Sequence, residues 1–206
     1  MRHATQSPKT LTSVETTAIL AATSRSDGDL RDHLILAIAL GTGLRVSELV
    51  ALNVGDVRSG KGAKGVWTLR ASTTKNNRGG TIALPEKLRR KVSRYLKWKK
   101  DRNEDIGPDD PLFLSRGGGR GGCSGGGRLS VRAAQHTFRI WQERCGFDRR
   151  VGFHCLRHTF CSNLWRSSGD LRLVQAAARH VSQATTSIYV HATVEDVLRG
   201  VQDIPC

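Results

Sequence analysis

The stretch HCLRHTF, residues 154–160, decides the expected fold of this chain. It places His154 and Arg157 three residues apart, and on a helix this spacing puts both side chains on one face. A titratable imidazole and a planar cation can then act on the same group. One such pair occurs often by chance. Its meaning depends on three further stretches: GTGLRVSEL (41–49), STTKNNRGG (72–80) and ARHVSQATTSIYVH (178–191).

Length and charge set the class of protein. The 206 residues are enough for one domain with a substantial core, and 33 Lys and Arg against 18 Asp and Glu give a net charge of +15. Such an excess predicts a polyanionic partner, because basic side chains displace counterions from phosphates. A ribosomal-type structural protein or a merely cationic surface would have the same charge.

Cysteine usage and hydropathy indicate the compartment. The five cysteines have no framework spacing, no leader resembles a signal peptide, and no apolar run is long enough to span a bilayer. We therefore expect a cytoplasmic, reduced, DNA-associated protein with no membrane partner.

Hydrophobic periodicity predicts a mainly α protein with a small antiparallel β-hairpin. A loose segment at 1–10 precedes a helix that Thr12 or Ser13 caps. Glycines at 41 and 43 break the second helix after Leu40. Further helices are expected at 46–53, 85–100, 131–146 and 171–180, around HCLRHTF, and from Thr185 or Thr186 through Tyr189. Ser130 is expected to cap the helix at 131–146 and Gly146 to end it, and Asp170 to cap the helix at 171–180. The run PLFL at 111–114 is expected to be a short buried strand or an extended stretch.

The β-like runs at 66–72 and 81–84 predict a hairpin whose tip carries Lys75 and Arg78. The asparagines at 76 and 77 and the glycines at 79 and 80 are expected to supply positive φ. A lysine at a hairpin tip is usually solvated and inert, so Lys75 has a role only if the tip folds over a ligand.

The helix expected at 85–100 has an apolar stripe that includes Tyr95, which indicates a core tyrosine. Basic side chains crowd its other faces, at 87, 89, 90, 91, 94, 97, 99 and 100. Their density favours contact with a phosphate backbone, and a solvated basic helix is the alternative. We select Arg90, Arg94 and Lys97, with Arg78 of the hairpin, as DNA-binding candidates.

The run RGGGRGGCSGGGR at 116–128 is of low complexity and predicts a flexible loop. Its arginines can contact DNA nonspecifically, but a tolerated insertion is the preferred interpretation.

Breaking and rejoining DNA without a metal ion requires an oxygen nucleophile, fixed positive charge at the phosphate and an acid for the departing 5′ oxygen. Arginine suits the charge because its fork matches phosphate, and lysine or histidine suits the acid. The chain has two tyrosines, and Tyr95 is expected in the core. If the nucleophile is a tyrosine, Tyr189 is therefore the only good candidate. Arg45 follows a glycine-bounded turn from which it can reach outward, although on its own segment a pair with Glu48 would explain it as well.

The order LGTGLRVSEL, lysine on a hairpin, HCLRHTF, GDLRLVQAAARH and TTSIY resembles the catalytic domain of the tyrosine recombinase (phage integrase) family, from about Leu11 to His191. The resemblance implies that Arg45 and Arg157 clamp the scissile phosphate and that His154 moves protons there. It also implies Lys75 as the general acid, His180 as a phosphate ligand, Tyr189 as the nucleophile of a 3′-phosphotyrosyl link, and Glu48 as a supporting residue. No metal or other cofactor is implied.

The resemblance further implies double-stranded DNA with specific recombination sites as the partner, and a homo-oligomer, a tetramer on synapsed DNA. We expect the catalytic domain at 11–193 and a tail at 194–206 that packs on a neighbouring protomer, with docking on its own chain as the alternative. The chain resembles shorter members that lack the N-terminal helical domain, or an excised domain. It departs from the family pattern at Arg179, where members usually have glycine.

Three rivals remain. A type IB topoisomerase shares the tyrosine chemistry but relaxes DNA without exchanging partners. A non-catalytic DNA-binding protein could retain the fold. A zinc site is the third, because His154, His158 and Cys161 lie on one helical face, next to Cys155. Buried cysteines of ordinary packing function explain the last pattern more simply.

Overall fold

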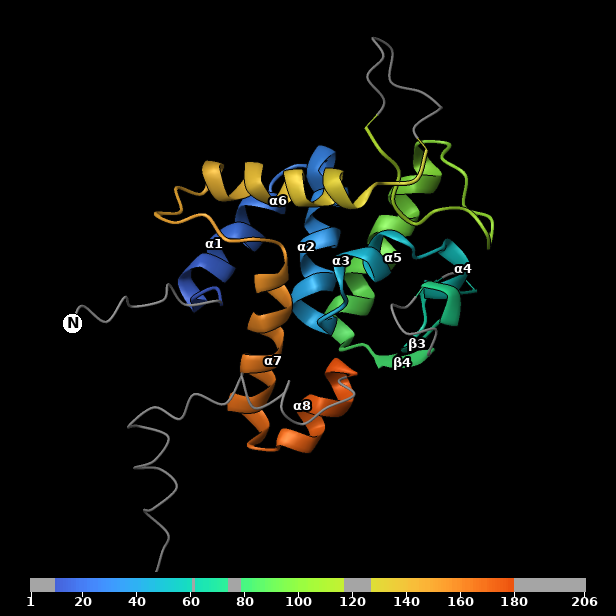
Figure 1. The fold of residues 1–206 in the computed structure, drawn as a ribbon. Coiled ribbons are helices and arrows are strands. Elements are labelled where there is room, and N and C mark those ends of the chain that lie inside the picture. The colour runs from blue at the N-terminus through green and yellow to red at the C-terminus, as the bar shows by residue number, and fades with distance from the viewer. Residues whose placement is uncertain (1–9, 61, 74–78, 117–126, 180–206) are drawn as a thin grey trace, which may run out of the picture. The chain divides into compact units, whose positions relative to one another are not determined.

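The fold is seen in a computed structural model (Figure 1). It describes residues 10–60, 62–73, 79–116 and 127–179. The chain divides into two compact units, residues 1–160 and 161–206, which are considered separately below. Helix α7 (His154–Ser168) crosses from the first unit into the second.

The first unit is built around helix α2 (Leu30–Thr42), whose side chains are nearly all buried. Helix α1 (Ser13–Thr23) packs on it and begins with a reciprocal cap, because Thr12 accepts from the Glu15 amide and Glu15 from the Thr12 amide. The expected cap at Thr12 is confirmed. A single 3-10 turn, η1 (Asp27–Asp29), joins the two helices.

Helix α2 ends at Thr42, two residues after Leu40, where the glycines at 41 and 43 had led us to place its end. Thr42 keeps the last turn helical through a 2.7 Å bond from its hydroxyl to the carbonyl of Ile38. Gly43, at φ 62°, is the left-handed residue that stops the helix, whereas Gly41 remains inside it. The expectation that the helix breaks after Leu40 was therefore wrong.

Two small antiparallel hairpins form the β structure. Strands β1 (Arg58–Ser59) and β2 (Gly62–Ala63) form a pair that the sequence did not indicate. Strands β3 (Val66–Leu69) and β4 (Gly80–Ala83) form the expected hairpin, with a 3-10 turn η2 (Ala71–Thr73) after β3. Its tip, with Lys75 and Arg78, lies outside the described residues.

Glycine has a different role in this hairpin from the one predicted. Neither Gly79 nor Gly80 has a positive φ, and Gly80 belongs to β4. A Cβ on Gly79 would lie 3.0 Å from the carbonyl oxygen of Leu69. The glycine therefore permits a close approach of two backbones and does not supply a turn.

Helix α5 (Glu86–Asp101) packs its apolar stripe against α2, and Tyr95 is buried, stacked on Trp98, as predicted. Lys99 was expected on the basic surface, and this was wrong. Its side chain is fully buried and its ammonium lies 2.8 Å from the carboxylate of Glu104. A buried lysine needs such a partner, and an acid beyond the helix end does not show in helical periodicity.

Helix α6 (Val131–Arg144) packs on α1 and on helix α3 (Val46–Val50). Ser130 caps it through the amide of Ala133, and Gly146, at φ 65°, follows its end, both as predicted. Before it, the segment around Phe113, expected as a short buried strand or an extended stretch, is buried and forms isolated bridges, Asn53 with Pro111 and Leu114 with Arg128.

The two ends of the expected flexible loop at 116–128 are attached to the folded body. Arg116 pairs with Asp32 at 3.1 Å, and the bridge between Leu114 and Arg128 closes the base of the segment. Ser115 also donates its amide to the carbonyl of Gly127. Residues 117–126 between them lie outside the described part.

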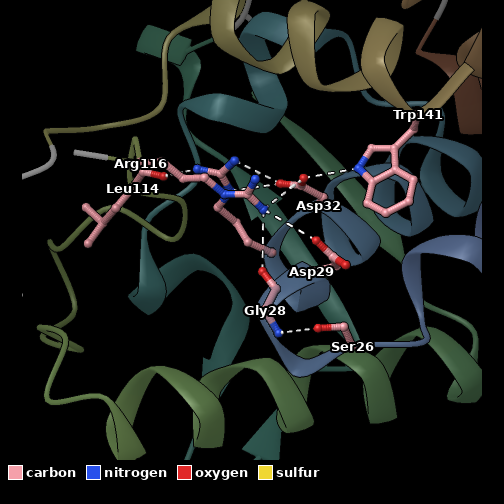
Figure 2. Close-up of polar contacts among 8 residues, drawn as sticks. Ser26, Gly28, Asp29, Asp32, Leu114, Arg116 and Trp141 are labelled. Atoms are coloured by element: carbon pink, nitrogen blue, oxygen red, sulfur yellow. Dashed lines mark hydrogen bonds and ion pairs between the residues drawn. The ribbon is translucent and has the colours of Figure 1, made fainter. Parts of the chain in front are cut away.

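A buried carboxylate joins three parts of the first unit (Figure 2). Asp32, in the first turn of α2, accepts from Nε and Nη2 of Arg31 at 3.0 and 2.8 Å and from the indole nitrogen of Trp141 at 3.1 Å. Arg116 donates to Oδ2, the oxygen that also accepts from Trp141, and Arg31 also donates to the carbonyl of Leu114. The Asp32 network thus ties α2 to α6 and to the segment after Phe113.

The second unit contains the end of α7 and helix α8 (Leu171–Ala178). Asp170 caps α8 by accepting from the amides of Arg172 and Leu173, as predicted, and Val174 and Ala178 are buried. Among the helices that the structure describes, none is both long and apolar enough to cross a bilayer.

Replacing Asp32 with Asn should lower the free energy of unfolding by about 3–5 kcal/mol, because it leaves the buried Arg31 cation without its counter-charge. Urea unfolding measures the loss. Asp29→Asn is the control, since Asp29 approaches the same Arg116 only at 3.7 Å and is partly exposed. It should cost less than about 1 kcal/mol. Equal losses would show that the Asp32 network is not a structural anchor.

Candidate functional site

The candidate site is built on the turn at Gly43. The amide of Gly43 closes α2 on the carbonyl of Ala39, and the chain then turns into Arg45. Its own carbonyl accepts a 2.5 Å hydrogen bond from Nη1 of Arg157, 114 residues away. A Cβ at this position would collide with the ring of Phe160, one helical turn further along α7. The turn therefore requires glycine for both its φ and its contact.

Arg45 is the N-cap residue of helix α3 (Val46–Val50). Its amide donates to Oε2 of Glu48 at 2.9 Å, and its Nη1 lies 3.1 Å from Oε1 of the same carboxylate. The pair with Glu48 that the spacing allowed is therefore present. Glu48 is almost completely buried, however, while a third of the Arg45 side chain stays exposed. The buried carboxylate of Glu48 thus holds Arg45 in place and leaves part of its guanidinium-bearing side chain accessible to solvent.

His154 and Arg157 are both on the first part of α7 but differ in exposure. Arg157 is buried at 2% exposure, and His154, at the start of the helix, is exposed. Partial desolvation lowers the pKa of His154 below its usual value, and the positive charges of Arg157 and Arg45 lower it further. At neutral pH the ring is therefore uncharged and able to accept a proton, and it becomes cationic only in more acidic solution.

The segment gives no support to a zinc site. The rings of His154 and His158 meet edge to face, with centroids 4.7 Å apart. Cys155 and Cys161 are buried, and burial raises the pKa of Cys155 to about 12. Among the described residues no three His, Cys, Asp or Glu side chains lie as metal ligands would. The cysteines are packed as small hydrophobic residues, as the simpler interpretation held.

The remaining predicted site residues, Lys75, His180 and Tyr189, lie outside the described residues. The residue before His180 is described. Arg179 ends α8 in the left-handed conformation, at φ 55°, which glycine adopts at little cost. Arg179 thus adopts a backbone conformation that glycine favours, although glycine is absent here.

The DNA-binding candidates on α5 are all on the surface. Arg90, Arg94 and Lys97 are exposed, whereas Arg78 lies outside the described residues. The positive charges of this helix also affect a buried histidine of α2. Burial lowers the pKa of His33 to about 4, and the charges of Lys91 and Arg94 contribute. The side chains form a basic surface, and their contact with DNA remains a prediction.

The chain matches the phage integrase family model over residues 9–196 and belongs to that family. Curated relatives include tyrosine recombinase XerC of Actinobacillus pleuropneumoniae serotype 7 (strain AP76), 31% identical over 185 residues. XerC of Proteus mirabilis is 32% identical over the same length. Each match covers 89% of this chain and 55% of the relative, so the chain spans about half the length of these proteins.

Solved structures agree in fold. The XerA recombinase crystal structure matches with a TM-score of 0.75 at 25% identity, over 98% of this chain and 67% of that one. The catalytic domain of bacteriophage HP1 integrase matches with a TM-score of 0.61 at 22% identity, over 95% of both chains. The predicted fold class, a mainly helical recombinase catalytic domain with small antiparallel sheets, is confirmed.

Sequence reasoning missed the residues that hold the site together. Phe160 was part of the opening motif but had no assigned role, and Gly43 was expected only to break a helix. A glycine two residues before a candidate arginine was the available signal for Gly43. The Asp32 network had none, because its partners are far apart in sequence.

Gly43→Ala should destabilise the protein more than Gly146→Ala. Both positions have a positive φ, of 62° and 65°, so both substitutions cost about 1–2 kcal/mol of backbone strain. Only at Gly43 does the new methyl meet another side chain, since nothing lies within 4 Å of a Cβ at Gly146. The excess at Gly43 should be about 1–3 kcal/mol in urea unfolding.

The excess should disappear when both glycine variants are compared in a Phe160→Ala background. If Gly43→Ala and Gly146→Ala cost the same in the unmodified protein, the contact between the turn and α7 is not a constraint.

Proposed function

We propose that this chain is the catalytic part of a site-specific DNA recombinase that breaks and rejoins DNA through a 3′-phosphotyrosyl intermediate. The main support is the Gly43 turn, which joins the start of α3, where Arg45 lies, to Arg157 on α7. The charges of both arginines also lower the pKa of His154, whose ring is uncharged at neutral pH. Family membership and relatives named tyrosine recombinase support it.

In the proposed reaction Arg45 and Arg157 bind the non-bridging oxygens of the scissile phosphate and stabilise the charge that grows in the transition state. The hydroxyl oxygen of Tyr189 attacks phosphorus, and its proton passes to His154. The bond from phosphorus to the 5′ oxygen breaks, and Lys75 protonates the departing oxygen, which becomes a 5′ hydroxyl. The phosphodiester is replaced by a phosphotyrosyl bond of similar energy, so a 5′ hydroxyl can reverse the reaction without a cofactor.

The remaining residues have supporting roles in this scheme. His180 is a further phosphate ligand, and Glu48 supports Arg45 from its buried position. Arg78, Arg90, Arg94 and Lys97 contact the DNA backbone. The partner is double-stranded DNA with specific sites, bound by a homotetramer in the cytoplasm, with the tail at 194–206 joining neighbouring protomers.

Tyr189→Phe should abolish covalent attachment to DNA, because it removes only the attacking oxygen. Duplexes that the protein selects from a random-sequence pool would be nicked beside the bound site. After cleavage the short fragment that carries the new 5′ hydroxyl is then lost, and the covalent adduct accumulates. The adduct is measured by denaturing gel electrophoresis. Tyr95→Phe is the control and should keep normal attachment, since Tyr95 is buried in the core.

Attachment by Tyr189→Phe would overturn the nucleophile assignment, and a wild-type protein that binds duplex without any adduct would indicate a non-catalytic DNA-binding protein. A reaction with two DNA molecules that each carry the selected site distinguishes a recombinase from a type IB topoisomerase. A recombinase exchanges strands between two of its own sites, whereas a type IB topoisomerase relaxes supercoiled DNA without exchange.

A further inference from the structure

Helix α3, which carries Arg45 at its start, is only five residues long. A helix this short does not persist by its own hydrogen bonds, because nucleation costs more than one turn returns. Its position must therefore come from contacts made by other elements. Glu48 supplies them at the first turn, through the amide and guanidinium of Arg45.

The last carbonyls of α3 are held by two guanidinium groups. Nη1 of Arg128 donates to the carbonyls of Val50 and Leu52 at 3.1 and 3.0 Å. Nη2 of Arg70 donates to the carbonyl of Ala51, between them, at 2.7 Å. Three successive carbonyls at the end of α3 thus accept from arginine, and we call Arg70 and Arg128 the carbonyl cap.

The carbonyl cap has further fixed partners. Nη2 of Arg128 donates to Oδ1 of Asn53 at 2.6 Å, and Arg70 pairs with Asp56 at 3.3 Å. Asn53 is the N-cap residue of helix α4 (Val54–Val57), the next helix after α3, and Asp56 within α4 also accepts from the Asn53 amide. Cations suit this place because the end of a helix carries partial negative charge.

Two cations beside each other are costly, which argues against a chance arrangement. Desolvation lowers the pKa of Arg128, and the charge of Arg70 lowers it further, while Asp56 acts in the opposite sense. The planar fork of arginine can reach two carbonyls and an amide at once, whereas a lysine could satisfy only part of this set.

The two arginines come from two different segments of the chain, both later in sequence than α3. Arg70 follows β3 directly and precedes the predicted acid Lys75 by five residues. Arg128 lies in the bridge that closes the segment after Phe113. The carbonyl cap therefore links the helix of Arg45 to the β3–β4 hairpin and to the segment that leads into α6.

We propose that Arg70 and Arg128 are positioning residues that fix α3, and through it the guanidinium of Arg45, for attack on the scissile phosphate. The proposal rests on the recombinase function proposed above. The cap acts on Arg45 from the opposite end of the helix to Glu48. Loss of the cap therefore lowers the rate of the chemical step and leaves the affinity for DNA largely unchanged.

The first test is hydrogen exchange in the protein without DNA. Arg128→Gln and Arg70→Gln should each increase amide exchange in a peptide covering residues 45–53 by roughly tenfold. Arg58→Gln is the matched control. Arg58 also donates to backbone carbonyls, those of Gly60 and Ile106, but does not contact α3, and its loss should leave this peptide unchanged.

The second test separates chemistry from binding. With the nicked duplex, Arg128→Gln should slow single-turnover formation of the covalent adduct roughly 10- to 100-fold, as expected for a misplaced catalytic group. The dissociation constant should change by less than about threefold, since the proposed role of the cap is to hold α3 and not to bind phosphate. Arg128→Lys should restore part of the rate, and Arg58→Gln should match wild type in both measurements.

Unchanged exchange at 45–53 in both cap variants would overturn the proposal. A parallel loss of rate and DNA affinity would also overturn it, by showing that these arginines bind DNA directly. If the wild-type protein forms no adduct, the recombinase function itself fails, and the exchange experiment still decides whether the cap holds α3.

Discussion

The hydrogen bond from Arg157 to the carbonyl of Gly43 is the constraint on which the site depends. It fixes the first part of α7 against the turn between α2 and α3, so a guanidinium from residue 157 and one from residue 45 belong to the same region of the first unit. The turn has little freedom to change, because Gly43 has a positive φ and a side chain there would strike Phe160. A hydrogen bond to a neutral carbonyl positions the buried guanidinium of Arg157 without altering its charge.

The same physical device recurs across the first unit. Arginines donate to backbone carbonyls at Leu114, at the end of α3 and at Gly43, and in each case they connect segments that are far apart in sequence. Part of the net charge of +15 is therefore structural. Exposed basic side chains such as Lys97 of α5 can meet a polyanion, whereas the structural arginines are already engaged, so composition overstates the number of residues available for DNA.

Elements could be predicted from sequence wherever a local signal was sufficient. Thr12, Ser130 and Asp170 were expected to cap helices and do so, because a cap depends on three or four neighbouring residues. Predictions failed where a distant group decided the outcome. Lys99 was assigned to the surface because its counter-ion, Glu104, lies beyond the helix whose periodicity was considered. For the site, motif order indicated Arg45, His154 and Arg157, but it could not show that Gly43 joins them or that Arg128 holds the far end of α3.

The central claim is that Arg45 and Arg157 act together on the negative charge of one phosphate. The most direct measurement compares adduct formation on a nicked duplex with a natural scissile phosphate and on one with a neutral methylphosphonate at that position, for wild type and Arg45→Ala. On the natural phosphate the substitution should slow the reaction roughly 100-fold or more, as for loss of an oxyanion-stabilising donor. On the methylphosphonate, which has no charge to neutralise, the loss should be at least about tenfold smaller. An equal loss on both duplexes would contradict the account, because it would mean that Arg45 does not act on the charge of the scissile phosphate.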